Sequence, residues 1–212
     1  MKTVAVILAR GGSKGIPKKN IQMIGGLPLV THTINCAKWS DIDEVWVSTD
    51  SSYVKTIAQN AGAKVLDRPE KFSGDKSPSE HALLHFEENV DFDRLVFIQP
   101  TSPLLNPSYV NEGLRKLKEE NYDSVFSVYK EHWLPRWTTK IQPLNFENNK
   151  RPRRQDRSDV YVENGAFYIT TRDALLKSKT RVSGNIGVVE MSPYESFQID
   201  TWEDFNFVEK LL

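Results

Sequence analysis

The stretch VAVILARGGSKGIPKKN, residues 4–20, decides the fold prediction, because an apolar run passes directly into a glycine-rich, basic segment. Residues 4–8 are long enough for a buried strand and too short to cross a membrane. Residues 9–20 then hold three glycines, four basic side chains and no acidic one. Open α/β sheets bind ligands at the carboxyl ends of their strands, where a glycine-rich turn brings backbone N–H groups close to phosphate. The stretch therefore predicts an anion site after the first strand.

The turn matches neither of the two common phosphate-binding patterns. No Gly-Lys-Ser/Thr follows at the P-loop spacing, and the glycines do not form G-x-G-x-x-G. Arg10 and Lys14 would nevertheless add charge-assisted bonds to an anion. The alternative is an ordinary strand-to-helix loop with solvated lysines. The position of the whole stretch, directly after the first strand, favours the anion site.

Strands and helices alternate along most of the chain. Apolar runs predict further strands over residues 44–48, 63–66, 94–99, 124–128, 165–170 and 187–191. Helical periodicity predicts helices that begin near Pro28 and that run over residues 54–61, 79–89, 107–120 and 205–212. Such alternation is typical of an α/β domain with a Rossmann-like, mostly parallel mixed sheet and helices on both faces.

Composition limits the function classes. Lysine plus arginine, 28, balance aspartate plus glutamate, 28, so no global field favours a polyanion such as nucleic acid. Cys36 is the only cysteine, which excludes an intrachain disulfide and favours a reducing compartment. We expect one soluble, cytoplasmic domain over residues 1–212, with no membrane partner.

Residues 129–163 break the alternation. They are polar, rich in Pro, Asn and Arg, and show little periodicity. A loop of this length in a compact domain is usually functional or docked on a partner. Its apolar members are of the kind that form interface cores: Trp133, Leu134, Pro135 and Trp137. The alternative is a lid folded over its own subunit.

Seven motifs follow one another along the chain: LARGGSKGIPKKN (8–20), VSTD (47–50), RP (68–69), IQPTSPLL (98–105), YDSVFSV (122–128), KRPRRQD (150–156) and ENGAFY (163–168). In this order they resemble the motifs of the acylneuraminate cytidylyltransferases, the CMP-sialic acid synthetases. The fifth and sixth are similar to the animal enzymes. The resemblance implies a nucleotide-diphospho-sugar transferase-like fold and transfer of CMP from CTP to the anomeric hydroxyl of a nine-carbon keto-sugar acid, with release of pyrophosphate.

The resemblance also implies roles for the residues of the opening stretch. Arg10 and Lys14 would hold the triphosphate and act in catalysis, since phosphoryl-type transfer needs charge neutralisation and alignment. Asn20 would bond the cytosine or the ribose, because its amide offers both a donor and an acceptor. The structural alternative for Asn20 is a helix or turn cap.

Four more residues are implied to bind substrate. Arg68, Ser77 and Ser79 would contact the nucleotide, and Gln99, at the end of a strand, would face the acceptor sugar. The structural alternatives are a surface arginine at position 68 and helix caps at the two serines. For Gln99 the alternative is a purely structural role.

The basic run over residues 150–157 is implied to serve the active site. An arginine fork binds carboxylates bidentately, and sialic acid carries a carboxylate. We predict Arg153 as the catalytic member and Arg154 as its substrate-binding helper, and leave open which of the two points inward. The alternatives are a nuclear import or nucleic-acid signal and a solvated charge run, so a nuclear location stays open.

The expected metal site departs from the family pattern. Many relatives carry two aspartates in Asp-x-Asp that hold Mg²⁺, and here Gln198 stands in the first position. Asp200 remains, and on a strand the two side chains share a face. Mg²⁺ needs only one or two protein carboxylates beside substrate phosphates. We predict Asp200 as the ligand, with the number of metals open.

The resemblance implies CTP and sialic acid as ligands, and a homodimer, possibly a dimer of dimers, in which residues 129–163 form the dimerisation arm. Two rival functions remain. One is a cytidylyltransferase for another keto-sugar acid, such as deaminated neuraminate, legionaminate or 3-deoxy-octulosonate. The other is a basic binding module for nucleic acid or an import receptor.

Overall fold

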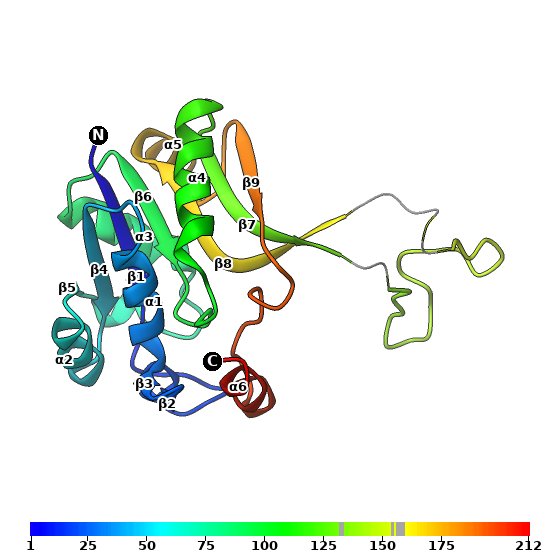
Figure 1. Ribbon diagram of the computed structural model, residues 1–212, viewed down its shortest axis with the longest axis horizontal. Helices are drawn as coiled ribbons and strands as arrows, with labels where there is room; N and C mark the ends of the chain where they lie inside the picture. The colour runs from blue at the N-terminus through cyan, green and yellow to red at the C-terminus, as the bar shows by residue number, and fades with distance from the viewer. Residues whose placement is uncertain (132–133, 154, 156–159) are drawn as a thin grey trace.

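The structure, a computed structural model, describes residues 1–131, 134–153, 155 and 160–212 (Figure 1). In this part of the chain seven strands form one sheet in the order β5-β4-β1-β6-β8-β7-β9. The strands are β1 (Thr3–Leu8), β4 (Glu44–Thr49), β5 (Lys64–Asp67), β6 (Arg94–Ile98), β7 (Ser124–Lys130), β8 (Tyr161–Thr171) and β9 (Ile186–Glu190). β8 runs antiparallel to its neighbours β6 and β7, and the remaining pairs are parallel. The mixed, mostly parallel sheet predicted from the sequence is confirmed.

Helices cover both faces of this sheet. They are α1 (Leu29–Lys38), α2 (Ser52–Asn60), α3 (Ser79–Asn89), α4 (Pro107–Glu119), α5 (Arg172–Ser178) and α6 (Trp202–Glu209). Apolar residues of α1, α2 and α4 pack in one cluster against one face. Those of α3 and α5 pack in a second cluster on the other face. The α1 helix begins directly after Pro28, as the sequence predicts.

The first strand shows why both faces need cover. Ala5 and Ile7 belong to the α1, α2 and α4 cluster, whereas Val4 and Val6 belong to the α3 and α5 cluster. All four side chains are fully buried. A strand buried on both faces has a continuous apolar run rather than an alternating one, which is what residues 4–8 show.

The carboxyl ends of the neighbouring parallel strands β1, β4 and β5 lie at one edge of the sheet. There the backbone N–H of Ala9 donates to the Ser48 carbonyl (3.1 Å), and that of Arg68 donates to the Thr49 carbonyl (2.8 Å). Two short 3₁₀ helices, η1 (Lys19–Ile21) and η2 (Glu70–Phe72), and the small hairpin of β2 (Met23–Ile24) and β3 (Leu27–Pro28) complete the connections. The edge predicted to bind ligand is therefore built from the glycine-rich turn and the segment that begins at Arg68.

The segment between β7 and β8 projects far beyond the sheet rather than folding back over it (Figure 1). Its described part holds two isolated β-bridges, and Trp137 packs edge-on against Phe146 at 5.2 Å between ring centroids. Trp133, predicted to help form an interface, lies outside the described residues. The projection predicted from the sequence is present. In the parts of the chain that the structure describes, no helix combines the length and apolar character required to span a bilayer.

Candidate functional site

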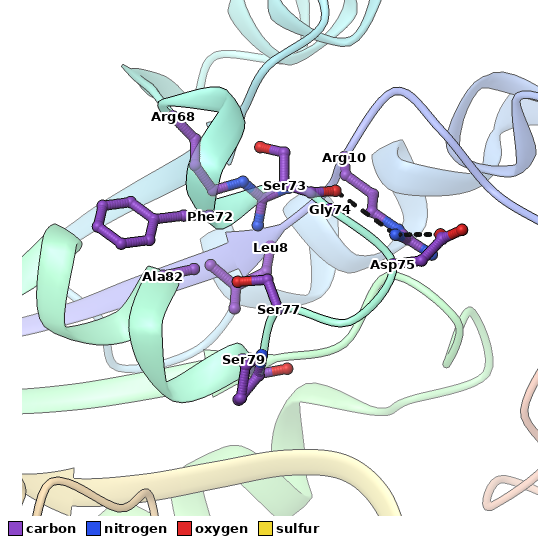
Figure 2. A pocket seen from close by; sticks show the side chains of 11 residues that line it. Leu8, Arg10, Arg68, Phe72, Ser73, Gly74, Asp75, Ser77, Ser79 and Ala82 are labelled. Atoms are coloured by element: carbon purple, nitrogen blue, oxygen red, sulfur yellow. Dashed lines mark hydrogen bonds and ion pairs between the residues drawn. The ribbon is translucent and has the colours of Figure 1, made fainter.

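A pocket of about 250 Å³ lies beside the carboxyl end of β1 (Figure 2). Leu8, Phe72 and Ala82 give it an apolar wall. Its polar lining includes four of the predicted nucleotide-site residues, namely Arg10, Arg68, Ser77 and Ser79. Segments that are far apart in the sequence, namely the first turn, the end of β5 and the start of α3, therefore meet in one cavity.

Arg68 is the most unusual residue of this pocket. Only 7% of it is exposed, yet its Nε and Nη2 atoms have no hydrogen-bond partner in the described part of the chain. Burial lowers the pKa of Arg68, and the positive charge of Arg10 lowers it further, while the negative charge of Asp50 acts in the opposite direction. A buried donor left unpaired costs about 1–3 kcal/mol. The two free N–H groups are therefore suited to acceptor atoms of a ligand, and the surface-arginine alternative is wrong.

The two serines belong to the same polar wall. The Oγ atom of Ser77 is buried, and none of the described residues forms a hydrogen bond with it. Ser79 is the first residue of α3, whose N-cap is Pro78 and lacks a side-chain cap hydrogen bond. The helix-cap alternative is therefore not supported for either serine. Ser77 and Arg68 therefore give the pocket buried polar atoms that other described residues do not bond.

Asn20 lines a second, smaller hollow of about 60 Å³, which shares Arg10 with the pocket. Its Nδ2 donates to the Arg10 carbonyl at 2.9 Å, while its Oδ1 is buried and has no hydrogen-bond partner among the residues that the structure describes. Only 6% of the residue is exposed. The side chain therefore fixes the backbone that carries Arg10 and leaves one acceptor for a ligand. It is not a simple cap of η1, whose N-cap is Lys18.

The predicted phosphate-binding cations meet at an acidic residue that sequence reasoning missed. Arg10 Nη1 lies 2.6 Å from Asp75 Oδ1 and donates to the Ser73 carbonyl at 3.4 Å (Figure 2). Lys14 Nζ lies 3.1 Å from Asp75 Oδ2. The hydrogen bond from Lys14 and that from Arg10 lower the pKa of Asp75. No local pattern signals this contact, because the partners are about 60 residues apart in the sequence.

Gln99 and Gln198 lie on either side of Gly165. A Cβ added at Gly165 would lie 2.9 Å from Gln198 Nε2 and 3.2 Å from Gln99 Nε2. Gly165 also has a φ of 72°, which favours glycine. Gln99 thus lies at the strand end predicted for it, against the backbone of β8.

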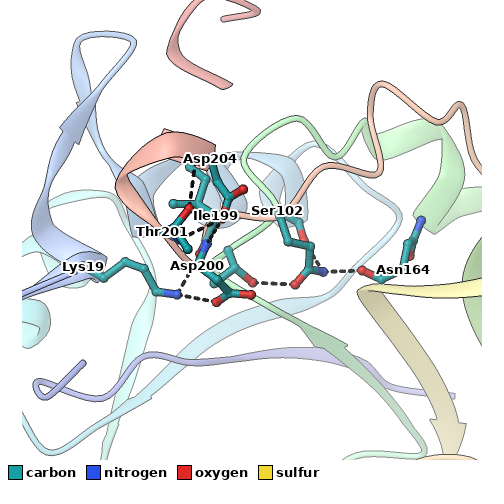
Figure 3. A network of polar contacts seen from close by, with 9 residues as sticks. Lys19, Ser102, Asn164, Ile199, Asp200, Thr201 and Asp204 are labelled. Atoms are coloured by element: carbon teal, nitrogen blue, oxygen red, sulfur yellow. Dashed lines mark hydrogen bonds and ion pairs between the residues drawn. The ribbon is translucent and has the colours of Figure 1, made fainter. Parts of the chain in front are cut away.

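Gln198 belongs to a polar network that includes Ser102 and Asn164, both of which Figure 3 labels. Its Oε1 accepts a hydrogen bond from Thr101 Oγ1 at 3.1 Å. Its Nε2 donates to Ser102 Oγ at 3.1 Å and to the Asn164 carbonyl. The amide therefore joins three segments of the chain. An aspartate here would place a carboxylate against the Asn164 carbonyl, so it would disturb the network rather than add a metal ligand.

Asp200 is held by a lysine of the glycine-rich turn (Figure 3). Lys19 Nζ lies 2.8 Å from Asp200 Oδ1 and donates to the Ile199 carbonyl at 2.7 Å. The Lys19 side chain is only 12% exposed, whereas that of Asp200 is 72% exposed. Among the described residues, no cluster of three or more His, Cys, Asp or Glu side chains could hold a metal. Asp200 is thus an open single carboxylate, which fits an ion that takes its other ligands from phosphates and water.

Replacing Gly15 with alanine tests how closely the turn and Asp200 must approach. A Cβ at this position would overlap the backbone carbonyl oxygen of Asp200, whereas one at Gly12 meets nothing within 4 Å. Overpacking against backbone costs about 1–3 kcal/mol. We expect Gly15→Ala to lower the Tm by several degrees and Gly12→Ala to change stability by less than about 0.5 kcal/mol. Thermal unfolding of the two variants checks this, and equal Tm values would contradict the close approach.

The structure does not bring the predicted catalytic arginine to the pocket of its own chain. Arg153 lies exposed in the projecting segment, and Arg154 lies outside the described residues. No described residue of that segment is among those that line the pocket. The role of Arg153 in catalysis therefore stays a prediction.

The chain is similar to several known proteins. The sequence profile of the family described as Cytidylyltransferase matches residues 4–212. N-acylneuraminate cytidylyltransferase B of Danio rerio is 40% identical over 97% of this chain and 50% of its own length. The N-acylneuraminate cytidylyltransferase of Streptococcus agalactiae serotype III (strain NEM316) is 31% identical over 97% of this chain and 52% of its own. The chain thus spans about half the length of these curated relatives.

Solved structures support the fold. The CMP:2-keto-3-deoxy-manno-octonic acid synthetase complexed with CTP superimposes with a TM-score of 0.77 at 21% identity, over 100% of this chain and 98% of that one. The 4-diphosphocytidyl-2C-methyl-D-erythritol synthase of Anaerococcus prevotii gives 0.68 at 15% identity, over 99% and 97%. At these identities the likeness shows the shared fold alone.

Proposed function

Because the chain belongs to the cytidylyltransferase family, we propose that it transfers CMP from CTP to the anomeric hydroxyl of a nine-carbon keto-sugar acid. The acceptor is N-acetylneuraminate or a close relative, and pyrophosphate leaves. The observation that carries the nucleotide assignment is the pocket in which unpaired donors of Arg68 lie beside Arg10. The acceptor assignment is supported by the similarity to N-acylneuraminate cytidylyltransferases over 97% of the chain.

The chemistry of Arg68 suits a cytosine. Its Nε and Nη2 atoms lie on the same edge of the guanidinium and form a planar fork of donors. Cytosine presents two adjacent acceptors, O2 and N3, on its pairing edge, whereas uracil carries a proton on N3. The fork would therefore accept CTP and reject UTP. The unpartnered Oδ1 of Asn20 and Oγ of Ser77 remain for the ribose or the exocyclic amine.

In the proposed reaction the anomeric oxygen forms a bond to the α-phosphorus of CTP. The bond from that phosphorus to the bridging oxygen breaks, pyrophosphate keeps the electron pair, and the hydroxyl proton is released. Such transfers depend on charge neutralisation and alignment more than on covalent help. Arg10 and Lys14 would supply positive charge to the phosphates, and Gln99 would hold hydroxyl groups of the acceptor.

Magnesium is proposed as the cofactor, with Asp200 as its protein ligand. The bound ion would neutralise phosphate charge and orient the triphosphate. Lys19 would position the carboxylate through Oδ1 and leave Oδ2 available to the ion. The amide of Gln198 would take no part, because the network that holds it uses both ends of the side chain.

We expect Asp200→Asn to raise the Mg²⁺ concentration needed for half-maximal rate by about tenfold or more, since loss of a group that orients a metal ligand already costs that much. Initial rates against Mg²⁺ at saturating CTP measure this. Glu203→Gln, which removes a nearby exposed charge on α6, is the matched control and should leave the curve in place. An unchanged curve for Asp200→Asn would remove this residue from the metal site.

The projecting segment is proposed to form a homodimer. Several large apolar side chains on it are exposed, namely Leu134 (63%), Trp137 (44%), Ile141 (76%) and Leu144 (65%). Exposed apolar side chains gathered on one segment mark an interaction surface. In a dimer the segment would carry Arg153 toward the pocket of the partner, where its guanidinium would bind the sugar carboxylate.

Release of pyrophosphate from CTP in the presence of a panel of sugar acids tests the proposed function. The panel contains N-acetylneuraminate, deaminated neuraminate, legionaminate and 3-deoxy-octulosonate, with UTP as the nucleotide control. We expect CTP-dependent release with at least one nine-carbon acid and none with UTP. A pure binding module would release none with any acceptor, and preference for 3-deoxy-octulosonate would overturn the acceptor assignment.

A further inference from the structure

The carboxylate of Asp75 lies where a phosphate is proposed to bind. Each of its oxygens meets a different cation, because Oδ1 is 2.6 Å from Arg10 Nη1 and Oδ2 is 3.1 Å from Lys14 Nζ. Figure 2 shows Arg10 and Asp75 joined at the side of the pocket where Gly74 begins the loop. The loop thus brings its own anion to the cations of the glycine-rich turn.

The loop around Asp75 has free space on two sides. Gly74, Asp75 and Ser77 line the inner pocket of about 250 Å³ and also an open hollow of about 470 Å³ next to it. A Cβ added at Gly74 would meet nothing within 4 Å. The loop is therefore a thin wall with room to move, rather than a packed part of the core.

We propose that Asp75 competes with the triphosphate for its binding site. The Asp75 carboxylate pairs with Arg10 and Lys14 when the site is empty, and it leaves both cations when a polyphosphate binds. This inference rests on the proposed function. A carboxylate and a phosphate carry like charge, so they repel each other when they share the same two cations. A ligand that needs both cations must therefore displace Asp75 before it binds.

The exposure of the Asp75 side chain determines how strongly it holds Arg10 and Lys14. The Asp75 side chain is 41% exposed and that of Lys14 is 77% exposed. Exposed ion pairs are weak, so a triphosphate with several charges displaces the carboxylate readily. An exposed aspartate is ionised at neutral pH, and hydrogen bonds from Lys14 and Arg10 lower the pKa of Asp75 further.

The competitor makes Asp75 a determinant of which ligands bind well. Only those molecules in which Asp75 has left Arg10 and Lys14 can bind a phosphate ligand. The apparent affinity for that ligand is therefore reduced to the fraction of molecules in this state. CTP and tripolyphosphate need Arg10 and Lys14 without Asp75 bound to them, so the apparent affinities for these two ligands would be lowered. Cytidine has no phosphate, so it would occupy the base pocket beside Arg68 whether or not Asp75 is paired with Arg10 and Lys14.

The test is calorimetric binding of cytidine, CTP and sodium tripolyphosphate to three proteins in EDTA, which excludes metal effects. The proteins are the wild type, Asp75→Asn and Asp67→Asn. Asp67 is a matched control, because it is an exposed aspartate paired with Lys55 at 2.8 Å and lies outside the pocket lining. We expect Asp75→Asn to tighten CTP and tripolyphosphate by about threefold to tenfold and to leave cytidine unchanged. Asp67→Asn should change none of the three affinities.

Unchanged or weaker tripolyphosphate binding in Asp75→Asn would overturn the inference. Equal tightening in Asp67→Asn would also overturn it, since the effect would then be one of net charge alone. Failure of cytidine to bind any of the three proteins would contradict the base pocket and hence the proposed function. The tripolyphosphate measurements would still decide the role of Asp75 in that case.

Discussion

Arg10→Ala should lower the rate of CMP transfer by about a hundredfold or more, which is the usual effect of removing one donor that stabilises charge in a transition state. The residue begins the glycine-rich turn and lines the pocket, and its guanidinium bonds Asp75 and the Ser73 carbonyl. Its removal therefore opens no core cavity, and the fold should persist. Steady-state rates with CTP, together with an unchanged Tm, measure the effect.

Lys18→Ala is the control for Arg10→Ala. Lys18 belongs to the same basic stretch, but its Nζ lies over the Tyr53 ring at 5.4 Å and the residue does not line the main pocket. The account predicts a near-normal rate for this variant. A near-normal rate for Arg10→Ala would exclude Arg10 from the site, and equal losses for both variants would point to a general charge effect.

Co-expression of Arg10→Ala chains with Arg153→Ala chains should restore activity that each variant lacks alone. The reason is that the pocket and the projecting segment would come from different subunits in the proposed dimer. A mixed dimer then holds one site with both residues intact. With random pairing, about half of the dimers are mixed, so about a quarter of the wild-type rate should return.

Differently tagged chains and two-step purification isolate the mixed dimers for this measurement. Isolated mixed dimers should show about half the wild-type rate per dimer, since one of two sites is intact. Mixed dimers that stay inactive would show that Arg153 acts within its own subunit. A protein that sediments as a monomer would contradict the dimer itself.

Much of the fold follows from local sequence. The run over residues 4–8 predicts β1 because only a strand buried on both faces needs unbroken apolar side chains. Pro28 marks the start of α1 because a proline at the beginning of a helix loses no helical hydrogen bond. These features depend on neighbours in the chain, and the structure confirms them.

The start and the length of β8 were harder to predict from the sequence. The predicted strand covers residues 165–170, whereas β8 begins at Tyr161. The first residues of β8 pair with the end of β7, where Tyr129 opposes Val162 and Lys130 opposes Tyr161, and none of these four side chains is buried. Pairing outside the core needs no apolar pattern, so the sequence carries no signal for it.

Part of the candidate site could also be predicted from the sequence. Arg10 and Arg68 follow strands directly, and their position at the carboxyl edge of the sheet can be inferred from the alternation of elements. The bond between Lys19 and Asp200 joins residues 181 positions apart. The role of Asp75 likewise depends on how two loops meet, which is a property of the folded chain. Long-range polar contacts of this kind leave no periodic pattern to read.

The most direct measurement is the identity of the product formed from CTP, Mg²⁺ and N-acetylneuraminate. Mass spectrometry of the nucleotide fraction and an assay of pyrophosphate follow the two products together. We expect a sugar linked to CMP in equal amount to pyrophosphate, with no product when UTP replaces CTP. Free CMP or CDP with unmodified sugar, or CTP that is not consumed, would contradict the assignment of this chain as a transferase to a keto-sugar acid.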